Sequence, residues 1–131
     1  MSAPLKQHSI ALLSTTTLSV RVATATTLYT VPTQLGKRCL PDHIKIICGS
    51  DASTTAKITV GQVGALTDFL AENTLTNLAA QYDMVICRPI PATTPLKSKS
   101  YAPGTVIQID VTTADADGST DCTVLLFGTL Y

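Results

Sequence analysis

The acidic segment Asp115–Asp121 is the part of the sequence whose residue types most resemble a metal-binding loop. Its three carboxylates, on Asp115, Asp117 and Asp121, offer the oxygen ligands that Ca²⁺ prefers. The segment lacks the closing glutamate of an EF-hand loop, and no second ligand-bearing segment is evident. Asp117-Gly118 is also typical of tight hairpin turns. We therefore expect a metal-free hairpin, with a calcium site as the alternative.

Two histidines, His8 and His43, are the only imidazole candidates for acid–base catalysis. Asp42-His43 precedes an apolar run, and Asp42 could orient the ring as the acid of a catalytic triad does. No serine stands in the nucleophile motif GxSxG, and no local motif pairs a serine or cysteine with either histidine. We interpret His43 as a turn or surface residue, and we expect no enzymatic activity, no catalytic residue and no cofactor.

The four cysteines could form disulfides or bind a metal. Their positions, Cys39, Cys48, Cys87 and Cys122, are widely and irregularly spaced, unlike the short CxxC pairs of zinc sites. Cys48, Cys87 and Cys122 lie in or beside apolar runs, where a free thiol behaves as a small buried hydrophobe. In a protein made in the cytosol we expect thiols, with disulfides or a metal site as the alternatives.

Gly61-Gln62-Val63-Gly64 has the outline of the GxxG loop that clamps nucleic acid in KH domains. A loop of that kind is flanked by helices and basic residues, whereas this one follows a strand-like run. The formal net charge is +0, with 9 Lys+Arg against 9 Asp+Glu, and no basic stripe occurs. We interpret the segment as a turn or bulge and expect no nucleic-acid partner.

Apolar and polar residues alternate with a period of two along most of the chain, which is the pattern of β-strands. Ile107, Ile109 and Val111, for example, share one face of the run 106–113. The content of 45% hydrophobic and 14% charged residues allows a packed core. We expect an all-β fold, an antiparallel β-sandwich or jelly-roll-like barrel with at most one short helix. The expected strand segments are 18–22, 26–31, 44–48, 57–60, 84–90, 106–113 and 122–130.

A helix competes with strand structure only in the segment Thr67–Tyr82. Leu75 and Leu78 fit one helical face, but the asparagines and threonines around them are poor helix interiors. We expect at most a short helix, over Leu75–Gln81. Residues 1–7 contain a proline and lack periodicity, so they predict a flexible N-terminal arm, followed by one domain over residues 8–131.

Neither a membrane span nor a signal peptide is evident in the sequence. No run approaches the roughly 18–20 apolar residues that cross a bilayer. The first residues lack the charged and apolar regions of a secretory signal. We therefore expect a protein that is made and assembled in the cytoplasm, with no membrane partner.

Two segments give the chain a resemblance to a known group. Residues 26–32 (TTLYTVP), followed by Gly36-Lys37-Arg38, resemble the TLYTVPxGK strand–turn opening of β-sandwich virion proteins of tailed bacteriophages, of the capsid decoration or cement type. Residues 100–107 resemble the step before their penultimate strand, and residues 124–131 fit their closing strand. The resemblance covers residues 24–131, with Thr33-Gln34-Leu35 inserted before Gly36.

The resemblance implies a structural protein that binds the outer capsid surface and cements or decorates the head. It implies the major capsid protein and the chain itself, as a homotrimer, as partners, and the virion as the location. Alternatives are a tail- or fibre-associated or head–tail joining module, or a receptor- or carbohydrate-binding β-sandwich that uses Asp115–Asp121. Candidate contact residues on the arm and the proline-rich loop are Leu5, Ile10, Leu96 and Tyr101.

Overall fold

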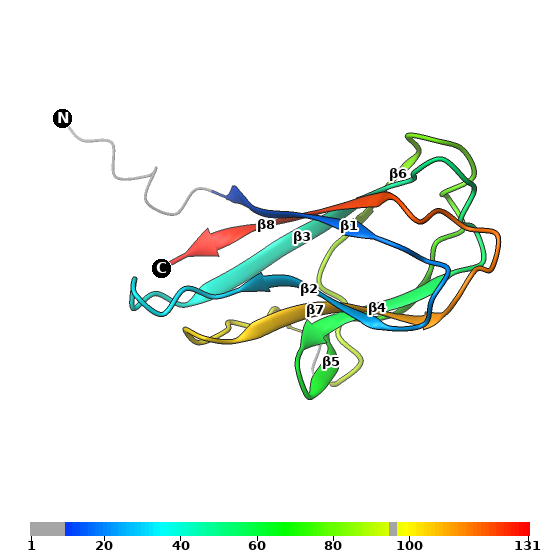
Figure 1. Cartoon of the computed structure of the whole chain (residues 1–131). Helices are drawn as coiled ribbons and strands as arrows, with labels where there is room; N and C mark the ends of the chain where they lie inside the picture. The colour runs from blue at the N-terminus through cyan, green and yellow to red at the C-terminus, as the bar shows by residue number, and fades with distance from the viewer. Residues whose placement is uncertain (1–9, 95–96) are drawn as a thin grey trace.

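Eight β-strands make up the regular secondary structure of the residues that the structure describes, 10–94 and 97–131 (Figure 1). The structure is a computed structural model, and its strands form two stacked layers. The strands are β1 (Ala11–Leu18), β2 (Ala25–Thr30), β3 (Cys39–Ile47), β4 (Lys57–Gln62), β5 (Ala65–Thr74), β6 (Met84–Cys87), β7 (Val106–Thr113) and β8 (Cys122–Leu130).

Each layer is a four-stranded sheet in which all neighbouring strands are antiparallel. The strand order is β1-β8-β3-β6 in one sheet and β2-β7-β4-β5 in the other. Four connections pass from one sheet to the other at the same end of the molecule, at the right of Figure 1. We call this the crossover end; it consists of residues 19–24, 48–56, 75–83 and 114–121. The predicted all-β sandwich is confirmed.

The hydrophobic core lies between the two sheets because alternate side chains of each strand point inward. Ile107, Ile109 and Val111 of β7 are at most 1% exposed, and Ile44 of β3 and Val124 of β8 are 0% exposed. Each aliphatic side chain buried to this degree stabilises the fold by about 1.5–3 kcal/mol. The alternation seen in the sequence is therefore the main source of stability of the sandwich.

Two tight turns depend on glycines in the left-handed backbone region, which other residues adopt at a cost. Gly104 has a φ of 87°, and the Thr105 N–H donates to the Ala102 carbonyl at 3.1 Å, as expected for a type II turn at Pro103-Gly104. Gly64 has a φ of 89° between β4 and β5. The GxxG segment is thus the end of β4 and its hairpin turn, as predicted.

The sequence predicts at most a short helix, over Leu75–Gln81, and the described residues contain no helix. Leu75 and Leu78 are buried, but in turns: the Leu78 N–H donates to the Leu75 carbonyl at 3.1 Å. The Ser53 N–H donates to the Leu78 carbonyl at 2.8 Å, so bonds to a neighbouring loop replace those of a helix. The residues before this segment form β5, a strand that the sequence did not predict.

Two predictions about chain path are wrong. The first strand covers Ala11–Leu18 rather than 18–22, and Val22 is 58% exposed because the chain leaves the sheet after Leu18. Asp117-Gly118 does not form a hairpin turn, because β7 and β8 belong to different sheets. Gly118 also lacks the positive φ that a type I′ turn requires.

Candidate functional site

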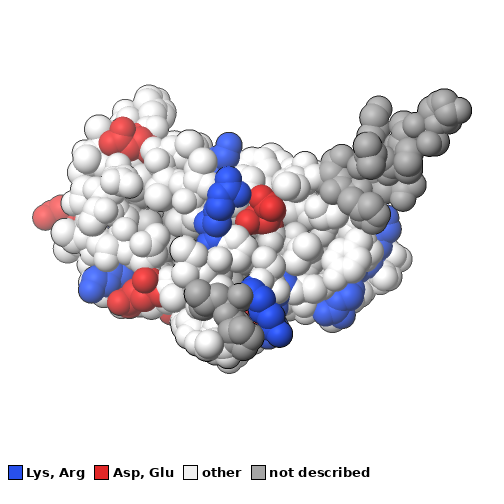
Figure 2. Space-filling view, turned by 180° about the vertical axis from the view of Figure 1, so that it is seen from behind, with Lys and Arg blue, Asp and Glu red and all other residues white. Residues whose placement is uncertain are grey.

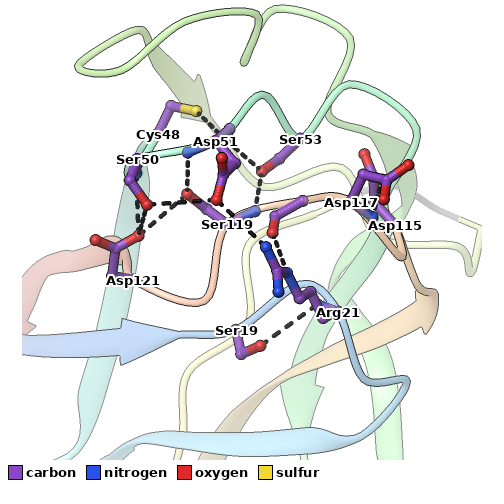
Figure 3. A network of polar contacts seen from close by, with 11 residues as sticks. Ser19, Arg21, Cys48, Ser50, Asp51, Ser53, Asp115, Asp117, Ser119 and Asp121 are labelled. Atoms are coloured by element: carbon purple, nitrogen blue, oxygen red, sulfur yellow. Dashed lines mark hydrogen bonds and ion pairs between the residues drawn. The ribbon is translucent and has the colours of Figure 1, made fainter.

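A network of polar contacts joins three loops at the crossover end, with Asp121 at one side of it (Figure 3). Oδ1 of Asp121 accepts hydrogen bonds from the Ser50 backbone N–H at 3.0 Å, the Ser50 hydroxyl at 3.2 Å and the Ser119 hydroxyl at 3.1 Å. The bond from the Ser50 backbone, and after it that from the Ser119 side chain, lowers the pKa of Asp121. This carboxylate oxygen therefore fastens the segment before β8 to the loop after β3.

Buried serines continue the network toward the core. Ser53 and Ser119 are 0% exposed, and the Ser119 N–H donates to Oγ of Ser53 at 3.0 Å. The Asp51 N–H donates to Oγ of Ser119 at 2.9 Å. Arg21, from the loop between β1 and β2, donates from Nε to the Gly118 carbonyl at 2.6 Å and forms an ion pair with Asp51 at 3.3 Å. Three loops that are distant in sequence are thus held together.

The carboxylates of Asp115–Asp121, the alternative calcium loop, do not converge on one point. Asp115 accepts hydrogen bonds from the Thr55 and Asp117 backbone N–H groups at 3.4 and 3.2 Å, away from Asp121 (Figure 3). Within residues 10–94 and 97–131, no group of three or more His, Cys, Asp or Glu side chains is arranged to hold a metal ion. The geometry supports a structural tie rather than a calcium site formed by Asp115, Asp117 and Asp121.

Replacing Asp121 with asparagine should flatten the dependence of stability on pH in acid. Because its folded-state pKa lies below the ordinary value of 3.8, the carboxylate stabilises the fold fully above that value. This contribution is lost as the pH falls through the lowered pKa. Thermal unfolding from about pH 5 to about pH 2 should show a steeper fall in Tm for the wild type than for Asp121→Asn.

Asp117→Asn is the matched control for this titration, because it removes a carboxylate of the same loop. The side chain of Asp117 accepts no hydrogen bond from the described residues, and it is exposed. Its variant should keep the wild-type acid slope. If Asp121→Asn keeps the wild-type slope as well, the hydrogen bonds to Asp121 do not contribute to stability in the way described.

His43 and Asp42 form a pair on the outer face of the β1-β8-β3-β6 sheet. Nδ1 of His43 lies 2.6 Å from Oδ2 of Asp42, and in the described part of the chain the ring makes no other side-chain hydrogen bond. The ring stacks on Phe127 with centroids 4.7 Å apart and planes inclined by 12°. Nζ of Lys45 lies 5.2 Å from the centroid of the same Phe127 ring. The surroundings of His43 are therefore those of a surface packing residue.

Six apolar side chains share this outer face, and we call them the apolar sheet face. Leu12, Met84 and Ile86 are 51%, 46% and 44% exposed. The register places Leu12 beside Phe127 and Lys45 beside both Leu125 and Ile86, so residues from four strands meet on one surface. Figure 1 shows two stacked layers, and no part of residues 10–94 and 97–131 forms a third layer outside this sheet. The members are Leu12, Ile47, Met84, Ile86, Leu125 and Phe127.

The outer face of the second sheet is polar by contrast. Nε2 of Gln108 donates to Thr27 at 3.4 Å, and the Thr112 hydroxyl donates to Glu72 at 2.8 Å. Figure 2, which shows the molecule from behind and looks at an edge of both layers, has scattered charges of both signs. The two faces of the sandwich therefore differ in the surface that they offer to a partner.

The predicted contact residues differ in their exposure and in whether the structure describes them. Ile10 is 54% exposed, directly before β1. Tyr101 is 2% exposed, and its backbone bonds to Cys39 at 2.7 and 2.8 Å, so it packs in the core and cannot serve as a contact residue. Leu5, Leu96 and the predicted arm of residues 1–7 lie outside the described residues.

Asp68 is a buried acidic residue that the sequence did not single out. It is 9% exposed, accepts a hydrogen bond from Nε2 of Gln62 at 2.8 Å, and lies 3.7 Å from Nζ of Lys99. Lys99 belongs to the proline-rich segment and Asp68 to β5, so this contact fastens that segment to the sheet. The sequence alone gives no signal for this contact, because Asp68 and Lys99 are far apart in the chain.

No pocket is formed by the part of the chain that the structure describes. No helix in that part is long and apolar enough to span a membrane.

A scan against protein-family models gave no match, and a search of the curated proteins gave none either. Among solved structures, the cyanophage Pam1 capsid asymmetric unit contains a chain with a similar fold, at a TM-score of 0.57 and 14% sequence identity. The alignment covers 94% of this chain and 86% of that chain. At this identity the similarity shows a shared fold, namely a β-sandwich also used in a phage capsid.

Proposed function

We propose that the chain is a structural, non-enzymatic virion protein that binds the outer capsid surface of a tailed phage and cements or decorates the head. The observation that carries the proposal is the apolar sheet face, because three of its side chains are well exposed to solvent. In this proposal its partners are the major capsid protein and further copies of itself, assembled in the host cytoplasm. The fold that it shares with a chain of the cyanophage Pam1 capsid asymmetric unit supports the proposal.

The apolar sheet face is small, which suits a contact that binds weakly in one copy and is repeated in many copies around the shell. Its six side chains occupy outward positions that are each about 4.8 Å by about 6.8 Å, which gives a patch on the order of 200 Å². A standard protein interface buries about 800 Å² on each partner, so the patch would form the centre of a small interface. Lys45 lies within the face, between Leu125 and Ile86, whereas His43 and Arg88 border it and would form a polar rim. Many such contacts around a shell bind strongly through multivalency.

Ile86→Asp should weaken binding to emptied capsids by about tenfold or more, because a desolvated carboxylate opposes burial at an interface. The folded state should tolerate the change, since Ile86 is 44% exposed and pairs with Lys45, which would face the new carboxylate. Co-sedimentation with emptied capsids, together with thermal unfolding of the free protein, measures both effects.

Thr27→Asp provides the control, since it adds the same charge to an exposed position on the other sheet. It should bind like the wild type. Equal binding by all three proteins would show that the apolar sheet face is not the contact surface. If the wild type fails to bind capsids and instead binds glycans or tail components, the cement proposal is wrong and the receptor-binding or tail-associated alternative replaces it.

A further inference from the structure

Cys48 and Cys122 occupy opposing positions on neighbouring strands. The β3–β8 register pairs Ile46 with Val124 and Ile47 with Thr123, so the next position brings Cys48 opposite Cys122. Both are free thiols and are 1% and 0% exposed, which places them on the same inward side of the sheet.

The backbone hydrogen bonds show which kind of cross-strand pair this is. The Cys48 N–H donates to the Asp83 carbonyl at 2.7 Å, and the Cys48 carbonyl accepts from the Tyr82 N–H at 3.0 Å. Both groups of Cys48 therefore point toward the segment before β6 and away from β8. Cys48 and Cys122 are thus a non-hydrogen-bonded pair, in which the Cα atoms are about 4.5 Å apart. Disulfides need Cα separations of about 4.4–6.8 Å, so the backbone can accept the bond without moving.

We propose that Cys48 and Cys122 are a disulfide-forming pair that staples β3 to β8 beneath the crossover end. Sγ of Cys48 now lies 3.2 Å from the Asp51 carbonyl and 3.7 Å from the Leu78 carbonyl, so rotation of this side chain toward β8 would exchange these two contacts for the covalent bond. The staple would form when the chain passes from reducing to oxidising surroundings.

The oxidant is a low-molecular-weight disulfide such as oxidised glutathione. One protein thiolate attacks it, forms a mixed disulfide and releases one glutathione thiolate. The second protein thiolate then attacks the protein sulfur of the mixed disulfide and releases the second glutathione thiolate. Two protein thiols lose two electrons and two protons in total, and one glutathione disulfide becomes two thiols. Burial, and after it the neighbouring Cys122, raises the pKa of Cys48, so the exchange should accelerate as the pH rises.

The other two cysteines provide a matched control. Cys87 pairs with Ile44, and Cys39 pairs with Leu130 and Tyr101, so neither faces another cysteine. The double variants Cys48→Ala/Cys122→Ala and Cys39→Ala/Cys87→Ala each remove two buried thiols, but only the first removes the proposed staple.

The test is to incubate the folded wild type and both double variants with oxidised glutathione at about pH 8.5, and then to alkylate and digest them with trypsin. We expect a disulfide that joins peptides 46–57 and 100–131 in the wild type and in Cys39→Ala/Cys87→Ala. Their Tm should rise by roughly 5–15 °C and fall back with a reductant. Four free thiols, glutathione adducts without the cross-link, or the same gain in Cys48→Ala/Cys122→Ala would each overturn the proposal.

Discussion

Phe69→Ala is expected to lower the free energy of unfolding by about 3–5 kcal/mol, the range for truncation of a buried aromatic residue. Phe69 is 1% exposed and is one of the largest fully buried side chains of the protein. A domain of this size is usually stable by only about 5–15 kcal/mol, so the variant should lose a large share of its stability. Urea unfolding at 25 °C measures the loss as a lower midpoint at an unchanged slope.

Phe127→Ala is the comparison for Phe69→Ala, because it removes the other of the chain's two phenylalanines, which lies on the proposed contact surface. Phe127 is half-buried on the apolar sheet face, where it contacts His43 and Lys45. Loss of that stack and cation–π contact should cost only about 1 kcal/mol. The variant should instead bind capsids more weakly. Equal losses of stability in Phe69→Ala and Phe127→Ala would contradict this assignment of core and surface.

Strands with a strong contrast between their two faces could be predicted from the sequence. In 106–113 the inward positions are all branched aliphatic residues, and β7 covers the predicted residues. The predicted segments 44–48 and 122–130 correspond to β3 and β8 for the same reason. Alternation of this kind reports which side chains enter the core, so it identifies a sandwich before any pairing is known.

Two strands escaped prediction because the period of two is weak or interrupted in them. β1 is rich in serine and threonine, and its residues before Leu18 are only exposed or half-buried, as suits an edge strand. In β5 three consecutive residues, Asp68, Phe69 and Leu70, are buried, and the pairing with β4 is shifted between Ile58 and Val60 and again before Gln62. Such irregular pairing hides a strand from any test of strict alternation.

The candidate surfaces depend on register, which the sequence does not encode locally. In 122–130 the alternation assigns Phe127 to the side of the threonines, but the β3–β8 register is needed to place His43 beside it. Likewise, Asp115–Asp121 resembles a metal loop only while its partners are unknown. Ser50, which donates to Asp121, lies 71 positions away in the chain.

Gly49→Ala is expected to destabilise the protein by about 3 kcal/mol, since it overpacks the site and displaces the buried Ser119 hydroxyl. A Cβ atom on Gly49 would lie 2.6 Å from Oγ of Ser119 and 2.8 Å from the backbone carbon of Asp121. The backbone of Asp121 cannot retreat cheaply, because Cys122, the next residue, begins a central strand. The alanine should therefore push apart the loops that Asp121 joins, and thermal and urea unfolding would report the loss.

Gly64→Ala is the control that separates the effect of crowding at Gly49 from the general effect of replacing a glycine on stability. Gly64 has open space around its Cβ position but a φ of 89°, so alanine there should cost only the backbone strain of about 1–2 kcal/mol. Gly49→Ala should in addition flatten the acid slope of Tm, because Asp121 loses the Ser50 backbone bond that most lowers its pKa, whereas Gly64→Ala should keep that slope. If Gly49→Ala is the milder variant, or if it retains the wild-type acid slope, close approach of the two loops at Gly49 is not what holds the crossover end together.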